Sequence, residues 1–434
     1  MNRRYLHRSL PMVSTRQLWI DSIYLGFTKL ILALFFLPMA NAISQETENR
    51  NPYSKARTHL IELILKPGGI KNDSVLNAIT ATPRHEFVPY PLRDQAYLDR
   101  ALPIGEAQTI SSPFIVALMT EVIQPKLTDQ VLEIGTGSGY QAAVLSPLVN
   151  QVYTIEIVEQ LAATTTKLLD RLGYKNIFTK AGDGFQGWKE HAPFDKIIVT
   201  CSPDKPPQPL VDQLKEGGLM VIPVGARYQQ LLRVFRKEGN RLIPISARPT
   251  LFVPMTGTAE SQRQDKLDSA NPTIINSDFE AKADGDFIPN WYYEFGAKLE
   301  EVPDAPSGKH VVTFKNETQG VPTNLLQGIP MDGRIVSKLR LSGHVTTSGV
   351  KISPDFEEEP FIILQFLDEN RNRIGYNWLG PFVGDLKWHK SESTFPVPFE
   401  SREAIVLIGL FGAVGSASFD DIKIEVLERK EQPK

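Results

Sequence analysis

The sequence has little of what builds cross-links, metal sites or nucleic-acid surfaces. Its single cysteine, Cys201, excludes an intrachain disulfide. Its seven histidines are scattered and, with one cysteine, give none of the ligand spacings of metal sites. Charge of neither sign is in large excess: the net charge of −3 and the isoelectric point near 6.2 argue against a general nucleic-acid-binding protein. The chain has 434 residues, 41% of them hydrophobic and 22% charged, which indicates two or three globular domains with apolar cores.

Also missing are uncharged apolar runs of roughly 18 residues or more, as a membrane-spanning helix needs, although a shorter apolar run lies near the N-terminus. There a basic leader precedes the apolar segment Leu30–Met39, and small residues follow at Ala40 and Ala42. This layout predicts a secretory signal peptide over residues 1–42, with Met12 as an alternative start, and a periplasmic or secreted protein. The alternative is an uncleaved anchor, for which ten apolar residues are short. We therefore expect no stable membrane span after cleavage, which changes the net charge from −3 to −7 by removing five basic residues and one acid.

Residues 54–257 alternate between helical and strand patterns, after a polar tether over 43–53. Helical spacing of apolar residues predicts helices beginning near 54, 73 and 113. Runs rich in Val and Ile predict buried parallel strands, with helices at 139–147 and 158–172 between them and two further strands joined at 238–240. The predicted buried strands are 131–134, 152–157, 176–181, 196–200 and 219–224. Such alternation is typical of a doubly wound, Rossmann-like α/β domain.

The pattern changes after residue 257. Residues 258–270 are polar, lack periodicity and are predicted to form a linker. Over 271–430 the helical pattern vanishes, and short alternating runs recur between Gly, Pro and Asn residues. This part of the chain is predicted to be an all-β jelly-roll sandwich.

The stretch VLEIGTGSGY (131–140) joins a predicted strand to a predicted helix through three glycines. Glycine at 135 and 137 tolerates a positive φ and lets a ligand approach the backbone. The turn would lie at the carboxyl ends of the strands, where open α/β sheets bind ligands. Glu156 ends the next strand and can accept both hydroxyls of a ribose, and Asp183 follows the third strand, where it can meet an adenine amine.

This arrangement is similar to that of class I S-adenosylmethionine-dependent methyltransferases. The cofactor carries no phosphate, and the loop has no lysine. NAD binding is the alternative, and the G-x-G-x-G spacing disfavours it. The resemblance assigns nine residues to the cofactor: Glu133, Gly135, Thr136, Gly137, Gly139, Glu156, Asp183, Gly184 and Thr200.

Residues 54–260 also resemble the protein-L-isoaspartate O-methyltransferase family throughout. The stretches that carry this resemblance are PRHEFVP (83–89), ALPIGEAQTISSPFIVALMTE (101–121), VLEIGTGSGYQAAVL (131–145), AGDGFQGW (181–188), APFDKIIVT (192–200), LKEGGLMVIPVG (214–225) and LFVP (251–254). The resemblance implies methyl transfer from S-adenosylmethionine to the α-carboxyl group of L-isoaspartyl residues in damaged proteins. The ester then closes to a succinimide, which hydrolyses partly to aspartate. A carboxyl group with a pKa of about 4 is already ionised at neutral pH and needs no general base.

The same resemblance gives roles to residues of the QTIS stretch. Ser111 lies next to the reacting carboxylate in this family, whereas Ser112, directly before Pro113, is the better candidate for capping the following helix. The substrate side is assigned to Gln108, Thr109, Ile110 and Val253, beside Phe252. The chain departs from the family pattern at Ala107, where glycine is usual, at Leu251, where arginine is usual, and at Cys201, where alanine is usual.

Residues 271–430 resemble galactose-binding-like carbohydrate-binding modules. The resemblance rests on NSDFEA (276–281), a tryptophan at 291, SGKH (307–310) and GAVGSASFDDIKIEV (412–426). It implies a structural calcium held by Asp278, Glu280 and Asp420, for which the alternative is that they are hydrogen-bonded turn acids. Five aromatic residues are candidates to stack on sugars, although most tryptophans in sandwiches are core: Trp291, Tyr292, Tyr293, Trp378 and Trp388.

Three hypotheses remain open at this point. The first is an exported repair enzyme that acts on isoaspartyl proteins and is tethered to envelope glycan by its sandwich domain. The second is an envelope binding protein with a vestigial methyltransferase domain, and the third is a methyltransferase for another carboxylate. S-adenosylmethionine is made in the cytoplasm, whereas the N-terminal signal predicts a protein outside it, so the predicted location conflicts with the supply of the cofactor. If the leader is not used, the protein would be cytoplasmic.

Overall fold

The computed structural model describes residues 52–264, 268–282, 287–351 and 358–430. The predicted signal peptide and residues 43–51 of the predicted tether lie outside these ranges. In the part that is described, no helix is long and apolar enough to cross a membrane. The two domains described below belong to one unit within His59–Lys434.

Helices precede and accompany a central sheet. The helices are α2 (Ser54–His59), a wide helical segment (Leu60–Leu65), α3 (Asp73–Ala81), α4 (Pro113–Val122), α5 (Tyr140–Leu145), α6 (Glu159–Arg171), α7 (Gln208–Gln213) and α8 (Thr258–Ser261). Helices α2 to α6 begin within one residue of the predicted positions, whereas α7 and α8 were not predicted. Short 3-10 turns lie at Arg84–Glu86, Tyr90–Gln95, Ser146–Leu148, Gly184–Gln186 and Lys189–His191.

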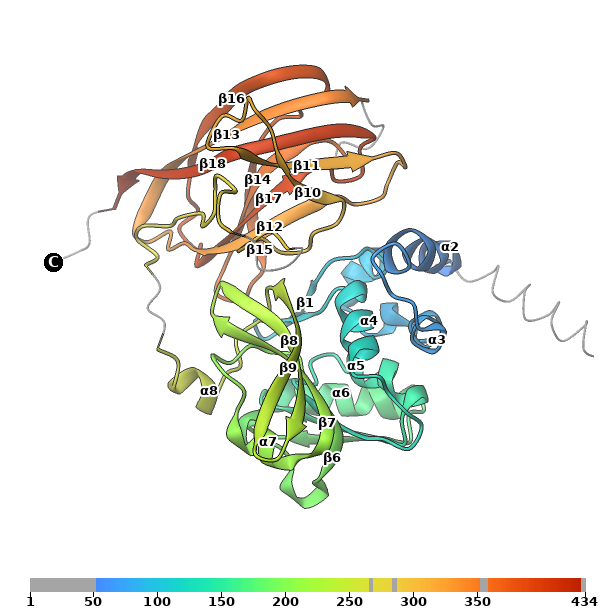
Figure 1. Ribbon diagram of the computed structural model, residues 1–434. Coiled ribbons are helices and arrows are strands. Elements are labelled where there is room, and N and C mark those ends of the chain that lie inside the picture. The colour runs from blue at the N-terminus through green and yellow to red at the C-terminus, as the bar shows by residue number, and fades with distance from the viewer. Residues whose placement is uncertain (1–51, 265–267, 283–286, 352–357, 431–434) are drawn as a thin grey trace, which may run out of the picture. The chain divides into compact units, whose positions relative to one another are not determined.

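The central sheet has seven strands in the order β5-β4-β3-β6-β7-β8-β9 (Figure 1). The first five are parallel, and β7, β8 and β9 pair in antiparallel fashion. The order reverses on either side of β3, so right-handed crossovers place α7 on the face opposite α5 and α6. The strands are β3 (Gln130–Ile134), β4 (Gln151–Glu156), β5 (Ile177–Ala181), β6 (Phe194–Val199), β7 (Leu214–Ala226), β8 (Gln229–Glu238) and β9 (Arg241–Thr250). The predicted doubly wound α/β domain is confirmed.

The parallel strands are apolar because both of their faces are covered. Val131, Leu132 and Ile134 of β3 are at most 2% exposed, and every residue of β6 after Asp195 is buried. Burying a Val, Leu or Ile side chain stabilises a fold by roughly 1.5–3 kcal/mol. The central strands therefore hold the edge of the sheet, where the loops of the site begin, in a fixed position.

A separate two-stranded hairpin precedes α4. It pairs β1 (Leu102–Gly105) with β2 (Gln108–Ile110) in antiparallel fashion. Its turn places Glu106 at φ 53° and Ala107 at φ 56°, both in the left-handed region. Glycine adopts this backbone conformation more easily than alanine. The turn therefore explains why glycine is usual at this position in the family, and Ala107 adopts the conformation at a cost.

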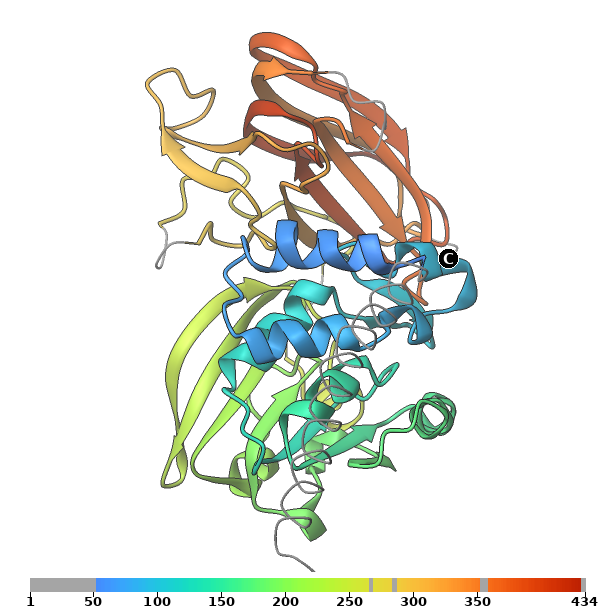
Figure 2. The same ribbon diagram turned by 90° about the vertical axis from the view of Figure 1, so that its right-hand side faces the viewer.

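Residues 271–430 form the predicted all-β sandwich. Its two antiparallel sheets have the strand orders β10-β11-β18-β13-β16 and β12-β17-β14-β15 (Figures 1 and 2). The strands are β10 (Ala297–Glu301), β11 (His310–Asn316), β12 (Asn324–Pro330), β13 (Val336–Val350), β14 (Phe361–Leu367), β15 (Arg373–Leu379), β16 (Gly384–Pro396), β17 (Glu403–Gly409) and β18 (Gly415–Arg429). Alternate residues of both sheets, including Phe314, Leu341, Leu364 and Phe419, build one buried core.

The structure differs from the sequence prediction at the start of the linker. α8 occupies its first residues, and the side chain of Arg263 is only 5% exposed. The apolar residues Met255 and Ala259 on either side of Gly257 join the core of the α/β domain. That domain therefore continues to at least Arg263, which hydrophobic periodicity could not show because polar contacts hold this segment.

Candidate cofactor and acceptor site

A pocket opens at the carboxyl ends of β3, β4 and β6, at the point where the strand order reverses. This is where a doubly wound sheet leaves a crevice between crossovers that run in opposite directions. Its walls are Gln108, Thr109, Ile134, Gly135, Gly137, Ile155, Glu156, Ile157, Gly184, Thr200, Cys201, Val253, Pro254, Met255 and Thr256. Eight of these residues are among the predicted site residues.

The glycine loop has the backbone geometry that its sequence predicts. Gly135, Gly137 and Gly139 have φ of 92°, 53° and 87°, and the amide of Gly135 donates to the Ile155 carbonyl at 2.9 Å. A Cβ on Gly135 would lie 2.5 Å from Oγ1 of Thr200, and one on Gly184 would overlap Ile134. Positions 135 and 184 therefore have no room for a side chain, and we call the pocket-lining residues Gly135, Gly137 and Gly184 the glycine cradle.

Glu156 joins the end of β4 to this loop. Its Oε2 accepts from the Gly137 amide at 2.8 Å, and its Oε1 accepts from the Val158 amide at 3.0 Å. The side chain is only 5% exposed, yet it forms part of the pocket wall. A carboxylate oxygen can accept more than one hydrogen bond, so both oxygens of Glu156 can still accept from the two hydroxyls of a ribose. The geometry fits the predicted role.

Threonines hold the same loop from three sides. The hydroxyl of Thr200 donates to the carbonyls of Ile134 and Gly135, at 2.9 and 2.7 Å. Thr136 shares a 2.7 Å hydroxyl contact with Thr154 on β4, and neither Thr136 nor Gly139 at the start of α5 lines the pocket. These contacts fix the loop, and of the predicted pair Thr136 and Thr200 only Thr200 reaches the pocket.

Glu133 lies inside the sheet rather than on the pocket wall. It is fully buried on β3, and neither carboxylate oxygen has a hydrogen-bond partner among the residues that the structure describes. Burial raises its pKa to about 8; the nearby Thr154 hydroxyl lowers the pKa in part, and the charge of Glu156 raises it. A neutral carboxyl group at pH 7 is the consequence.

Asp183, expected to meet an adenine amine, is engaged with protein donors. Its Oδ1 accepts from the Phe185 amide at 2.9 Å, and its Oδ2 accepts from the amide and hydroxyl of Thr258, at 3.0 and 2.6 Å. Burial raises the pKa of Asp183, but these hydrogen bonds outweigh it and hold the pKa below its ordinary value. Asp183 thus ties α8 to the end of β5, while its neighbour Gly184 forms the pocket wall.

The QTIS residues are divided between the pocket and α4. Gln108 and Thr109 line the pocket, while Ile110 is buried at the end of β2. Ser112 caps α4, because its Oγ accepts from the Ile115 amide at 3.4 Å, as predicted. Ser111 is half-buried and stands between the pocket-lining residues and the cap.

Two charged residues that sequence reasoning missed support this loop. Oδ1 of Asp99 accepts from the Phe114 amide at 2.8 Å, at the start of α4. Burial raises the pKa of Asp99 to about 6, although hydrogen bonds from Phe114 and Ser112 and the charge of Arg84 oppose it. Arg84 is fully buried, donates to the Ala96 carbonyl at 2.7 Å and lies 4.9 Å from the centre of the Tyr140 ring.

The segment after β9 supplies the last wall. Val253 lines the pocket, as predicted, and its carbonyl accepts from the Ser202 amide at 2.8 Å. Phe252 belongs to the core, since it is 6% exposed and its amide donates to the side chain of Gln230 at 2.7 Å.

Of the positions that depart from the family pattern, Cys201 lines the pocket and Leu251 is half-buried. Met255 and Thr256 were missed because only tertiary contact, not local pattern, brings them back to the sheet.

The predicted calcium ligands do not form a metal site. Within the described residues, no group of three or more His, Cys, Asp or Glu side chains could hold a metal ion. Glu280 instead accepts from the amides of Lys309 and His310, both at 2.6 Å, and from the His310 ring at 2.9 Å, which lowers its pKa to about 2. Asp420 accepts from the amides of Ser307 and Asp421, both at 2.7 Å. Glu280 and Asp420 are thus hydrogen-bonded acids, as the turn-acid alternative supposes, and Asp278 accepts a long bond from the Glu280 amide, at 3.4 Å.

Most of the candidate aromatic residues do not stand at the surface. Trp291 and Tyr292 are at most 1% exposed, and Tyr293 and Trp388 are half-buried. Trp378 is 39% exposed on β15, beside Tyr376, which is 49% exposed and was not predicted. Their ring centroids are 5.3 Å apart.

Comparisons with known proteins match the same part of the chain. The family model described as Protein-L-isoaspartate(D-aspartate) O-methyltransferase (PCMT) matches residues 55–260. The chain is 48% identical over 233 residues to Protein-L-isoaspartate O-methyltransferase 2 of Shewanella sediminis, covering 53% of this chain and 95% of the relative. It is 52% identical over 206 residues to Protein-L-isoaspartate O-methyltransferase of Dictyoglomus turgidum, covering 47% of this chain and 93% of the relative.

Among solved structures, the chain is similar to a Plasmodium falciparum protein assigned to the same enzyme class and crystallised with S-adenosyl-L-homocysteine. The identity is 27%, the TM-score is 0.41, and the match covers 45% of this chain and 96% of that one. Residues 271–430 lie outside the range of the family model.

Proposed function

The chain belongs to the protein-L-isoaspartate O-methyltransferase family, and on that premise we propose that its α/β domain repairs damaged proteins. It transfers a methyl group from S-adenosylmethionine to the α-carboxyl group of L-isoaspartyl residues. The observation that carries this function is the glycine cradle bonded to Glu156, directly beside Gln108 and Thr109 of the QTIS hairpin. Donor and acceptor are thereby brought to one pocket.

The residues of the chain bind and orient the reactants. S-adenosylmethionine supplies an electrophilic methyl group on a sulfonium, and the acceptor carboxylate attacks it. Glu156 would hold the ribose hydroxyls, and the cradle at Gly135, Gly137 and Gly184 lets the cofactor approach the backbone. Because the acceptor is already ionised, rate enhancement comes from alignment and exclusion of water. We propose that the hydroxyl of the half-buried Ser111, two residues after the pocket residue Thr109, donates to the acceptor carboxylate.

The test uses residues 43–434, labelled S-adenosylmethionine, and a matched pair of isoaspartyl and aspartyl peptides. We expect base-labile methyl ester on the isoaspartyl peptide alone, reduced at least tenfold in Ser111→Ala. Ser112→Ala is the matched control, since loss of the cap destabilises α4 by about 1 kcal/mol but leaves the Ser111 hydroxyl in place. Equal labelling of both peptides would favour a methyltransferase for another carboxylate. No labelling and no cofactor binding would favour a vestigial domain.

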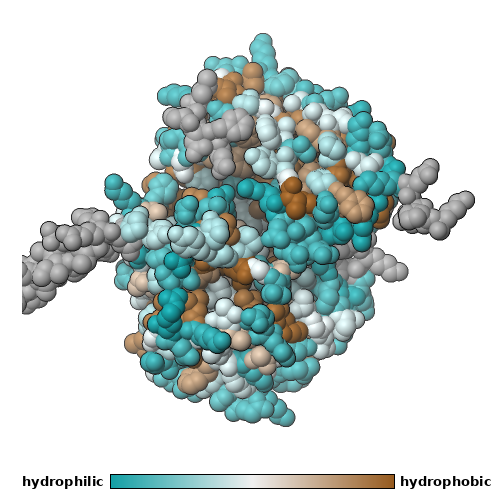
Figure 3. Space-filling view, turned by 180° about the vertical axis from the view of Figure 1, so that it is seen from behind, coloured by the Kyte–Doolittle hydropathy of each residue, from teal (hydrophilic) through white to brown (hydrophobic). Residues whose placement is uncertain are grey.

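We also propose that the sandwich domain binds envelope glycan through Tyr376 and Trp378. The support is local: two exposed, neighbouring rings on one strand, with the guanidinium of Arg373 5.5 Å from the centre of the Tyr376 ring. Stacking of sugar rings on such a platform buries apolar area. The face seen in Figure 3 shows apolar side chains in small patches among hydrophilic ones. Retention on insoluble envelope polysaccharide, lost in Tyr376→Ala and Trp378→Ala, tests the proposal; binding that survives both changes contradicts it.

Export remains a proposal that rests on the N-terminal sequence alone. We propose that the leader is cleaved after Ala42 and the mature protein is periplasmic or secreted. N-terminal sequencing of the protein from fractionated cells tests this. A mature chain that begins at Ile43 supports export, and a cytoplasmic chain that keeps its leader contradicts it.

A further inference from the structure

A short segment returns to the pocket after β9 and closes one of its walls. We call residues 254–263 the strap. The Met255 amide donates to the Ser202 carbonyl at 2.9 Å, and Pro254 pairs with Ser202 in a parallel bridge. Pro254, Met255 and Thr256 all line the pocket, and Met255 is 2% exposed. The strap thus lies against the end of β6, next to the pocket residues Thr200 and Cys201.

The middle of the strap is bonded to the predicted adenine side of the pocket. Gly257 has φ 76°, and a Cβ there would contact Ile157 and Asp183. Thr258 follows directly and donates twice to Oδ2 of Asp183. Because Asp183 precedes the pocket residue Gly184, a movement of the strap would move this side of the pocket.

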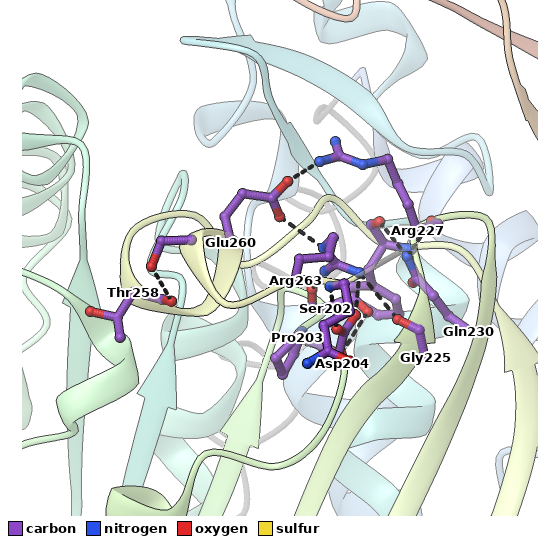
Figure 4. Close-up of polar contacts among 12 residues, drawn as sticks. Ser202, Pro203, Asp204, Gly225, Arg227, Gln230, Thr258, Glu260 and Arg263 are labelled. Carbon is purple, nitrogen blue, oxygen red and sulfur yellow. Dashed lines mark hydrogen bonds and ion pairs between the residues drawn. The ribbon is translucent and has the colours of Figure 1, made fainter. Parts of the chain in front are cut away.

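The end of the strap is held by one buried guanidinium (Figure 4). Nη2 of Arg263 donates to the Ser202 carbonyl at 2.6 Å, and Nη1 donates to the Gly225 carbonyl at 3.2 Å and to Oδ1 of Asp204 at 2.8 Å. Nε donates to Oε2 of Glu260 at 2.9 Å, and Glu260 also pairs with Arg227. One side chain therefore connects the end of β6, the end of β7 and α8.

These contacts need the planar guanidinium group of arginine rather than the ammonium group of lysine. The Arg263 side chain is 5% exposed, so its charge depends on the carboxylates of Asp204 and Glu260. Its three nitrogens donate in different directions to four acceptors, and the single ammonium of lysine cannot reproduce that geometry. Residue 263 also lies beyond residue 260, where the match to the family model ends.

We propose that Arg263 is a positioning residue for the methyl donor: it holds the strap closed against β6, with Thr258 holding the strap to Asp183. The inference rests on the proposed function, since it names what fixes one wall of the cofactor pocket. Arg263 acts through its bonds to Ser202, Gly225, Asp204 and Glu260, and so through the strap. Its loss weakens cofactor binding and leaves methyl transfer at saturating donor nearly unchanged.

The test measures the affinity of residues 43–434 for S-adenosylhomocysteine by calorimetry, with initial rates at saturating donor. Arg263→Lys should raise Kd at least tenfold while the saturated rate stays within about twofold. Arg171→Lys is the matched control, because this arginine also pairs with a carboxylate, that of Glu86, but is 59% exposed on α6. A folded Arg263→Lys variant with an unchanged Kd overturns the proposal.

A second variant covers the case in which Arg263→Lys does not fold. Thr258→Val removes the hydroxyl donor to Asp183 and keeps the amide donor. It should raise Kd several-fold and speed hydrogen exchange at the Met255 and Thr258 amides, whereas Ser261→Ala on the exposed side of α8 should do neither. Wild-type affinity in Thr258→Val overturns the proposal. No binding by the unsubstituted protein would instead contradict the proposed function itself.

Discussion

The buried carboxyl group of Glu133 should make the stability of the α/β domain depend on pH. Its pKa is raised from 4.5 to about 8 by burial on β3. Between these values the folded protein holds a proton that the unfolded chain has released, so the free energy of unfolding falls as the pH rises from about 4.5 to about 8. Each pKa unit is worth about 1.4 kcal/mol, so the full loss is about 5 kcal/mol.

Glu133→Gln should remove this dependence. The amide has nearly the size of the carboxyl group but does not ionise, so the variant and the parent should be equally stable near pH 5. Above pH 8 the variant should be more stable, by up to about 5 kcal/mol. Urea unfolding from pH 5 to 8.5 measures the difference, and the transition that S-adenosylhomocysteine shifts identifies the α/β domain.

The matched control is Glu190→Gln, which changes an exposed carboxyl group of the same domain. It should leave the pH profile of unfolding unchanged. If Glu133→Gln followed the parental profile at every pH, the carboxyl group would not be neutral in the folded protein. The explanation by burial would then be refuted.

Three further predictions concern the pocket and its hairpin. Ala107→Gly should raise the free energy of unfolding by about 1 kcal/mol, because it relieves a left-handed alanine at φ 56°; a loss of stability in urea would contradict this. Gly184→Ala should weaken S-adenosylhomocysteine binding at least tenfold in calorimetry, since its Cβ would overlap Ile134, whereas Gly375→Ala in the sandwich should not. Burial, with the charges of Glu156, Asp183 and Glu133, raises the pKa of Cys201, so alkylation at pH 7.5 should be slow by mass spectrometry. Bound S-adenosylhomocysteine should slow it further, and a rate indifferent to that ligand would place the thiol outside the site.

The sequence predicts best what depends on local pattern. The strands of the parallel sheet could be predicted from the sequence, because strands that are buried on both faces consist of continuous apolar runs. The glycine loop could be read because the positive φ at Gly135, Gly137 and Gly139 favours glycine. Glu156 followed from its place at the end of the strand next to that loop.

What the sequence could not show depends on contacts between distant residues. The bond from Arg263 to Ser202 joins residues 61 positions apart, and nothing near Arg263 distinguishes it from a linker arginine. The hydrogen bonding of the expected calcium ligand Glu280 could not be predicted for a similar reason: its donor His310 lies 30 positions away in the sequence. Trp291 and Trp378 look alike in sequence, and only the packing of the sandwich makes the first core and the second surface.

In the proposed reaction, the β1–β2 hairpin would link the donor pocket to the acceptor site. Gln108 and Thr109 line the cofactor pocket, and three residues after Thr109 the chain caps α4 through Ser112. Ser111 is therefore held between a strand that forms the donor wall and a helix whose first turn is bonded to Asp99. If Ser111 contacts the acceptor carboxylate as proposed, these elements would align the acceptor group before the reaction, which is what a reaction limited by alignment rather than by proton transfer requires.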